Sequence, residues 1–221
     1  MDPSLNRKIG LRITPWLART GITPNQVTLL ALASGLLAAW EFFRGPDHWL
    51  HGALWFQLSY ILDNCDGALA RLTGRSSGFG SWLDTGVDLL VHMAFFAGLG
   101  AAVARQNSGA VWMWVTCFTV AGVFFCYLGS FLRELRRRGS DALMHPDPPK
   151  GTEDSDFWSR LQVVMRTDFS FVVLAAALAG HMAWLLWSGL AGAFIYFASD
   201  LLRMVRPAGS RTGGGTGPLG G

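Results

Sequence analysis

Charged residues are scarce in this chain. They make up 15% of its 221 residues, against about 25% in soluble domains. Hydrophobic residues make up 51%, and the mean hydropathy is +0.31. This composition excludes an ordinary soluble enzyme. The formal net charge is only +3, and Lys and Arg stand in blocks beside apolar runs, so nucleic-acid binding is not indicated.

Cysteine is nearly absent. Cys65, Cys117 and Cys126 are an odd number, lie within apolar stretches and lack the spacing of metal ligands. They predict neither a disulfide framework nor a zinc site. We interpret them as packing residues.

The first 22 residues lack the continuous apolar core of a cleavable signal. Apolar side chains such as Leu5, Ile9 and Ile13 instead mix with basic ones such as Arg7 and Lys8. We expect residues 1–22 to form an amphipathic helix lying in the membrane interface. A loosely ordered basic leader is the alternative.

Long apolar runs fill most of the remaining chain. About 20 apolar residues cross a hydrocarbon core of about 30 Å. The candidate spans are residues 26–43, 49–70, 81–104, 110–132, 157–179 and 182–205. We therefore expect an all-α integral membrane protein whose domain, residues 23–206, has about six transmembrane helices. The Gly-rich residues 207–221 are expected to be disordered.

Lys and Arg are distributed unevenly between the connections. If the N-terminus is cytoplasmic, 16 of them lie on the cytoplasmic side and only Arg44 and Arg105 on the other. The positive-inside rule then predicts that both termini lie in the cytoplasm. The polar stretch 133–155 falls on the same side.

Four aspartates lie in these apolar runs, where a carboxylate is costly unless it is paired, hydrated or bound to a cation. Asp63 and Asp66 are three residues apart, and Asp84 and Asp88 are four apart, so each pair shares one helix face. A short hairpin would bring the pairs together. Divalent cations would relieve their mutual repulsion, and oxygen ligands favour Mg²⁺, Mn²⁺ or Ca²⁺ over zinc. Two such ions would suit phosphoryl transfer, whereas pairing with arginines or a cation path is the alternative.

The residues around these aspartates form one continuous pattern. It runs from Asp63 to Asp88 as D-x2-D-G-x2-A-R-x8-G-x3-D-x3-D, with eight fixed positions in twenty-six residues. The pattern resembles the signature of the CDP-alcohol phosphotransferases (CDP-alcohol phosphatidyltransferases). These are integral membrane enzymes that move a phosphoalcohol from a cytidine diphosphate carrier to an acceptor hydroxyl, releasing CMP.

The resemblance implies a role for each motif residue. Asp63, Asp66 and Asp84 would bind two divalent cations, Mg²⁺ or Mn²⁺, and Asp88 would be both a ligand and the general base. The residues implied to bind CDP are Pro24, Asn25, Thr28, Gly67, Arg71 and Gly80. Read without the resemblance, Thr23 and Pro24 also suit the cap and first position of a helix. Small residues such as Gly67 and Gly80 also serve helix packing.

The resemblance further implies a CDP-alcohol donor, by size CDP-diacylglycerol, a small polar acceptor, a role in phospholipid biosynthesis and a homodimer. Arg133, Arg136 and Arg137, followed by Arg138, could bind an acceptor phosphate. They could equally be topology signals or anchors for anionic lipids. Residues 69–88 resemble the members that act on inositol phosphate compounds.

Two other classes also use carboxylates in a membrane. A cation transporter or channel would spread them across the bilayer, whereas here they cluster near one face. A magnesium-dependent membrane prenyltransferase also takes a diphosphate substrate, but such enzymes are longer and lack the spacing of Gly67, Ala70, Arg71 and Gly80.

Overall fold

The computed structural model describes residues 5–107, 109–138 and 169–205, with the backbone alone for residues 130, 133–138 and 197–205. All regular structure in these ranges is helical, which confirms the all-α prediction there. The elements are α1 (Leu5–Arg19), α2 (Pro24–Arg44), the short 3₁₀ helix η1 (Pro46–His48), α3 (Trp49–Thr73), α4 (Gly78–Gln106), α5 (Ala110–Arg138), α7 (Phe169–Leu178) and α8 (Ala183–Val205).

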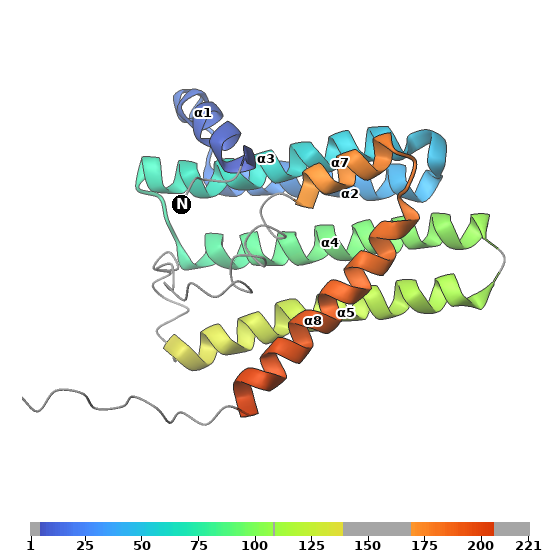
Figure 1. Cartoon of the computed structure of the whole chain (residues 1–221). Helices are drawn as coiled ribbons and strands as arrows, with labels where there is room; N and C mark the ends of the chain where they lie inside the picture. Colours follow the sequence, from blue (N-terminus) through green and yellow to red (C-terminus); the bar gives the residue numbers. More distant parts are fainter. Residues whose placement is uncertain (1–4, 108, 139–168, 206–221) are drawn as a thin grey trace, which may run out of the picture.

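Helix α2 is the common wall of the bundle (Figure 1). It packs along both α3 and α4, whereas α3 and α4 make few close backbone approaches to each other. Helix α5 lies against α4, α8 crosses α5 obliquely, and α7 lies on α3. The space between α3 and α4 is therefore filled by side chains, and this is where the candidate site lies.

Aromatic rings fill the part of this space that is remote from the α3–α4 hairpin. Phe42 of α2, Phe56 of α3 and Phe95 of α4 are all fully buried. The ring of Phe95 lies 5.0 Å from that of Phe42 and 4.7 Å from that of Phe56, measured between centroids. Such contacts add to the burial of apolar area. They make this end of the bundle a solid core.

Glycines allow α2 and α4 to approach closely. A Cβ atom on Gly35 would overlap Val91, and one on Gly98 would overlap the carbonyl oxygen of Ala39. Small residues at such contacts let backbones pack closely where no hydrophobic force drives helices together.

Local signals in the sequence fix where α2, α3 and α4 begin and end. Thr23 and Gln26 form a reciprocal capping box at the start of α2, with Pro24 at its first position, which confirms the predicted cap. Helix α3 ends at Gly74, whose φ of +66° favours glycine. The Ser77 hydroxyl then accepts a hydrogen bond from the Gly80 amide, 3.0 Å away, and starts α4. The hairpin is thus only a few residues long.

Helix α1 packs on α3 through a polar stripe. Asn6, Gly10 and Thr14 are buried. The side-chain nitrogen of Asn6 also donates a hydrogen bond to Ser170 Oγ of α7 at 2.9 Å. Leu11 and Trp16 are exposed. A helix is present over Leu5–Arg19, whereas the predicted amphipathic character of residues 1–22 and their place in a membrane interface stay predictions.

Three helices among the described residues are long and apolar enough to cross a membrane: Pro24–Arg44, Gly78–Gln106 and Ala110–Gly129. Helix α3 is also long, but polar residues lower its hydropathy, among them Gln57, Asp63 and Asp66. The first four predicted spans and the last coincide with helices, and the fifth coincides with α7 from Phe169 onward. Residues 157–168 and the tail 207–221 lie outside the described residues.

We expect Gly98→Ala to destabilise the bundle by about 1–3 kcal/mol, because the added methyl group meets a backbone oxygen that cannot rotate away. Gly86→Ala, in the same helix, is the control, because its Cβ would meet nothing within 4 Å. The higher helix propensity of alanine should raise the free energy of unfolding of this control by up to about 1 kcal/mol. Thermal unfolding in detergent measures both, and equal melting temperatures would contradict the close α2–α4 contact.

Candidate active site

Three of the four motif aspartates converge at the hairpin end of α3 and α4. One carboxylate oxygen from each of Asp63, Asp66 and Asp84 lies within 4.8 Å of the other two. Asp63 and Asp66 come from the last three turns of α3, and Asp84 from the second turn of α4. Asp88 lies one turn further along α4. The structure thus brings together three of the four aspartates that the sequence singled out, with the fourth one helical turn away.

This arrangement fits hard divalent cations. Mg²⁺ and Ca²⁺ bind oxygen ligands at about 2.0–2.6 Å, so two oxygens on one ion lie up to roughly 4–5 Å apart. The three converging side chains are all carboxylates, without a nitrogen or sulfur ligand among them. Their residues can therefore hold Mg²⁺ or Mn²⁺ after small rotations.

Asp66 is held in place from α2. The Thr28 hydroxyl donates to Asp66 Oδ2 at 2.5 Å, and both side chains are buried. The resemblance assigns Thr28 to CDP binding, and the structure places its hydroxyl on a predicted metal ligand. Hydrogen bonds to the ligands of a metal orient them and tune its affinity. Thr28 is thus the link between the wall helix α2 and the carboxylates.

The other residues that the resemblance assigns to CDP lie around the same end. A Cβ on Gly67 would lie 3.4 Å from Arg71 Nη1, so the exposed guanidinium of Arg71 passes over Gly67. A Cβ on Gly80 would lie 3.2 Å from Asn25 Oδ1. The start of α2, with Pro24 and Asn25, therefore meets the start of α4. A helix N-terminus beside an arginine is a favourable place for a diphosphate.

A histidine that the sequence analysis did not single out, His92, lies one turn beyond Asp88 on α4, on the side away from the hairpin. His92 Nδ1 is 2.7 Å from the backbone carbonyl oxygen of Asp88, and Nε2 is 2.8 Å from the Tyr60 hydroxyl. The carbonyl can only accept, so we assign the proton to Nδ1, and Nε2 accepts from Tyr60. Tyr127 of α5 also reaches this ring, at 3.2 Å. The signal was present, because His92 continues the i,i+4 stripe of Asp84 and Asp88.

The predicted acceptor residues Arg133, Arg136 and Arg137 lie in the last turns of α5, which returns toward the hairpin end of α4 (Figure 1). Their side chains lie outside the described residues. Their contacts therefore stay a prediction.

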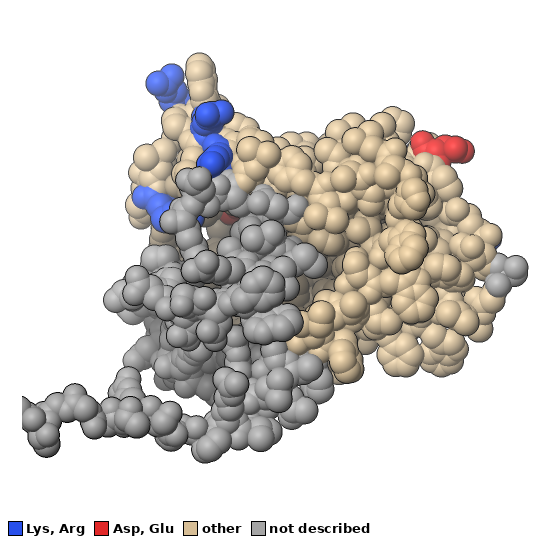
Figure 2. Space-filling view, in the orientation of Figure 1, with Lys and Arg blue, Asp and Glu red and all other residues tan. Residues whose placement is uncertain are grey.

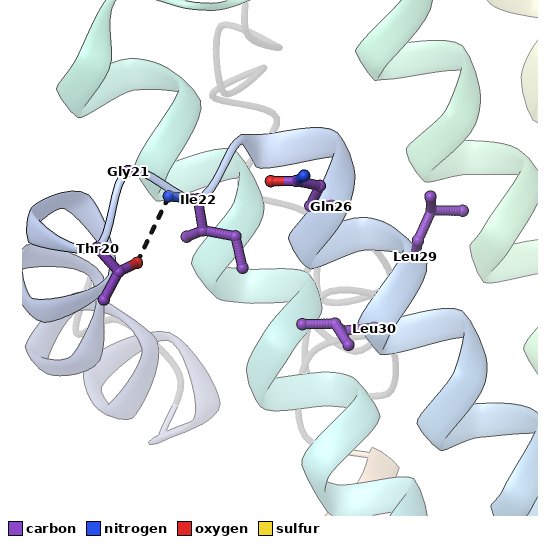
Figure 3. A pocket seen from close by; sticks show the side chains of 6 residues that line it. All are labelled: Thr20, Gly21, Ile22, Gln26, Leu29 and Leu30. Atoms are coloured by element: carbon purple, nitrogen blue, oxygen red, sulfur yellow. Dashed lines mark hydrogen bonds between the residues drawn. The ribbon is translucent and has the colours of Figure 1, made fainter.

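A shallow groove lies beside the start of α2 (Figure 3). Its volume is about 580 Å³, and it is lined by Thr20, Gly21, Ile22, Gln26, Leu29 and Leu30. The α1–α2 turn forms one side, where the Ile22 amide donates to Thr20 Oγ1. The groove does not contain the aspartates.

Comparison with known proteins decides the family. The model of the CDP-alcohol phosphatidyltransferase family matches residues 21–195. The chain belongs to this family. Every motif residue from Pro24 to Asp88 falls within the matched range.

Named relatives include the "bifunctional IPC transferase and DIPP synthase" of Aquifex aeolicus, 33% identical over 115 residues. They also include the archaetidylinositol phosphate synthase of Pyrococcus horikoshii, 35% identical over 133 residues. These alignments cover 52% and 60% of this chain. They span 26% and 66% of the relatives' own lengths.

A solved structure has the same overall arrangement. The phosphatidylinositol phosphate synthase of Mycobacterium tuberculosis, crystallised with CDP-DAG bound, superposes with a TM-score of 0.58 at 25% identity. The superposition covers 91% of this chain and 96% of that one. The membrane-protein fold of the phosphatidyltransferase is thereby supported independently of the motif.

We expect Thr28→Val to weaken divalent-cation binding by roughly 10- to 100-fold, because Asp66 loses the hydrogen bond that orients it. Thr28→Ser keeps the hydroxyl and should bind nearly as the parent does. Mn²⁺ binding to the purified protein, followed by electron paramagnetic resonance of the free ion, measures the effect. Unchanged affinity in Thr28→Val would show that the contact does not support the metal site.

Proposed function

We propose that this protein transfers the phosphatidyl group of CDP-diacylglycerol to a hydroxyl of an inositol phosphate, releasing CMP. The observation that carries the proposal is the convergence of Asp63, Asp66 and Asp84 from two helices, with Asp88 one turn away. Arg71 and Asn25 lie at the same end. Positive and polar groups for a diphosphate thus stand beside a cation site.

The substrates are inferred from relatives. The superposed Mycobacterium tuberculosis structure contains CDP-DAG, and further relatives are named phosphatidylinositol phosphate synthases, such as that of Cutibacterium acnes, 31% identical over 118 residues. The acceptor hydroxyl belongs to a phosphorylated polyol in this proposal. The arginines at the end of α5 supply the charge that such an acceptor requires.

Two Mg²⁺ or Mn²⁺ ions would neutralise the diphosphate and stabilise the charge that develops on the leaving CMP. Asp63, Asp66, Asp84 and Asp88 hold them, and Thr28 orients Asp66. The acceptor oxygen forms a bond to the β-phosphorus, while the bond from this phosphorus to the bridging oxygen of CMP breaks. The Asp88 carboxylate takes the proton of the acceptor hydroxyl.

His92 and Tyr60 form a hydrogen-bonded network with the backbone of Asp88, on its side away from the hairpin. The imidazole bonds to the carbonyl of Asp88 and to the Tyr60 hydroxyl, and the ring of Phe169 packs on it with 6.4 Å between centroids. This network restricts the turn of α4 that carries the base. Positioning of reacting groups supplies much of the catalysis in phosphoryl transfer.

The proposal places six helices across the membrane, with α1 in the interface and the site and both termini on the cytoplasmic side. Figure 2 shows Lys and Arg gathered at the hairpin end and acidic side chains at the opposite end. Arg44 and Arg105 end α2 and α4 at that opposite end. The asymmetry agrees with the positive-inside rule. We further propose that the domain comprises residues 23–206 and that the protein forms a homodimer.

The packing between the carboxylates and the end of the bundle opposite the hairpin disfavours a cation-transport function. Tyr60 and His92 are joined there, and the rings of Phe56 and Phe95 stack behind them. A cation path would need polar or hydrated groups through this part of the bundle.

Asp66→Asn and Asp84→Asn should each reduce CMP release at least 1,000-fold, on the scale of lost electrostatic stabilisation of a transition state. The assay uses CDP-diacylglycerol and inositol phosphate with purified protein in lipid. Asp47→Asn, an exposed aspartate at the opposite end, should leave the rate unchanged. A chelator should abolish activity, and Mg²⁺ or Mn²⁺ should restore it. Near-normal turnover of either site variant at saturating Mg²⁺ would overturn the proposed role of the aspartates.

Neutralising Arg133 or Arg136 to Gln should raise the KM for inositol phosphate by roughly 10- to 100-fold, because one charge-assisted phosphate contact is worth about 1.5–3 kcal/mol. The KM for the CDP donor should change far less. Arg12→Gln, an exposed residue of α1, is the control. If the arginines are only topology signals, insertion falls and the acceptor KM of the inserted protein stays unchanged.

A further inference from the structure

A second group of metal-ligating side chains lies at the end of the bundle opposite the aspartates. Glu41, His48 and His51 each place one ligand atom within 4.8 Å of the other two. They come from the last turn of α2, from η1 and from the first turn of α3. Neither the family signature nor the phosphoryl-transfer chemistry uses any of them.

The donor set differs in kind from that of the aspartate site. Two imidazoles and one carboxylate are ligands that Zn²⁺ and similar transition metals favour, whereas Mg²⁺ and Ca²⁺ favour oxygen alone. Two histidines and a glutamate leave one position of a tetrahedral ion for water. The chemistry of the three side chains therefore selects a borderline-soft divalent ion.

The geometry is close to that of a bound ion. His48 Nδ1 already lies 3.0 Å from Glu41 Oε2. Ligand bonds of about 2.0–2.2 Å place two ligand atoms of a tetrahedral zinc roughly 3.4 Å apart. The rings of His48 and His51 are 6.1 Å apart between centroids. His51 is exposed, so a rotation of its side chain brings it into range.

The connection that carries these residues is tightly ordered. Gly45 has φ +115° and donates to the Phe42 carbonyl at 3.2 Å, and the His48 amide donates to the Gly45 carbonyl at 3.0 Å. Trp49, next to His48, is buried in the core. The side chain of Glu41 is only 17% exposed. Two of the three ligands are thus held before an ion arrives.

One cation already competes for the carboxylate. Arg44 Nη1 lies 3.3 Å from each oxygen of Glu41. Its side chain is 43% exposed, so it can turn into solvent when an ion binds. Displacing it costs little, because exposed ion pairs are weak.

We propose that Glu41, His48 and His51 form a binding site for a divalent transition metal, zinc in the first instance, that ties the end of α2 to the start of α3. The site is separate from the proposed phosphoryl-transfer site, since it lies at the other end of α2 (Figure 1). An ion bound to all three side chains joins α2, η1 and α3. Because it binds the folded state, it raises the free energy of unfolding of the bundle.

The test uses the full-length protein, purified without a polyhistidine tag, and Zn²⁺ in competition with a chromophoric chelator. Measurement in an Asp66→Asn/Asp84→Asn background removes the contribution of the aspartates. We expect one zinc ion per chain. His48→Ala and His51→Ala should each lower the zinc affinity at least tenfold. His181→Ala, an exposed histidine of the α7–α8 turn, is the control and should bind as its parent. Arg44→Gln should tighten binding, because the competing cation is gone.

A spectroscopic measurement keeps the test independent of folding in the variants. Cu²⁺ added to the otherwise unchanged protein should show electron paramagnetic resonance splitting from imidazole nitrogens, and His48→Ala should lose part of it. Zinc should raise the melting temperature only when both histidines are present. Equal zinc affinity with and without His48 and His51, or a copper spectrum with oxygen ligands alone, would overturn the proposal.

Discussion

The repulsion among carboxylates placed in apolar surroundings is the constraint on which this structure depends. Asp63, Asp66 and Asp84 converge within 4.8 Å, in a part of the chain where even one ionised group is costly. The bundle accommodates them by keeping α3 and α4 apart and by packing both against α2. The space between α3 and α4 is therefore occupied by the carboxylates and by the side chains packed behind them.

Polarity changes in steps along the space between α3 and α4. The aromatic pair Phe56 and Phe95 lies deepest, the hydrogen-bonded pair Tyr60 and His92 comes next, and the aspartates stand nearest the hairpin. Each step follows from helical spacing, since residues three or four apart share a face. A group of carboxylates thereby adjoins a buried aromatic core.

The sequence predicted the parts of the site that depend on spacing within one helix or across one short hairpin. The clustering of the aspartates and the Thr23 cap belong to this kind, and the start of α2 follows from local capping. The contact of Thr28 with Asp66 does not, because 38 residues separate them. Neither does the polar stripe of α1, whose Asn6 meets Ser170. Such contacts depend on how helices pack, and hydrophobic periodicity carries no signal for a buried polar face.

Helix α2 carries side chains that contact neighbouring elements at both of its ends. Its first turns carry Asn25 and Thr28, which reach Gly80 and Asp66, and its last turn carries Glu41, which reaches His48. Between these ends, Gly35 and Ala39 hold α2 against α4 with little room to slide. The close contacts along α2 thus help to fix the register in which Thr28 meets Asp66.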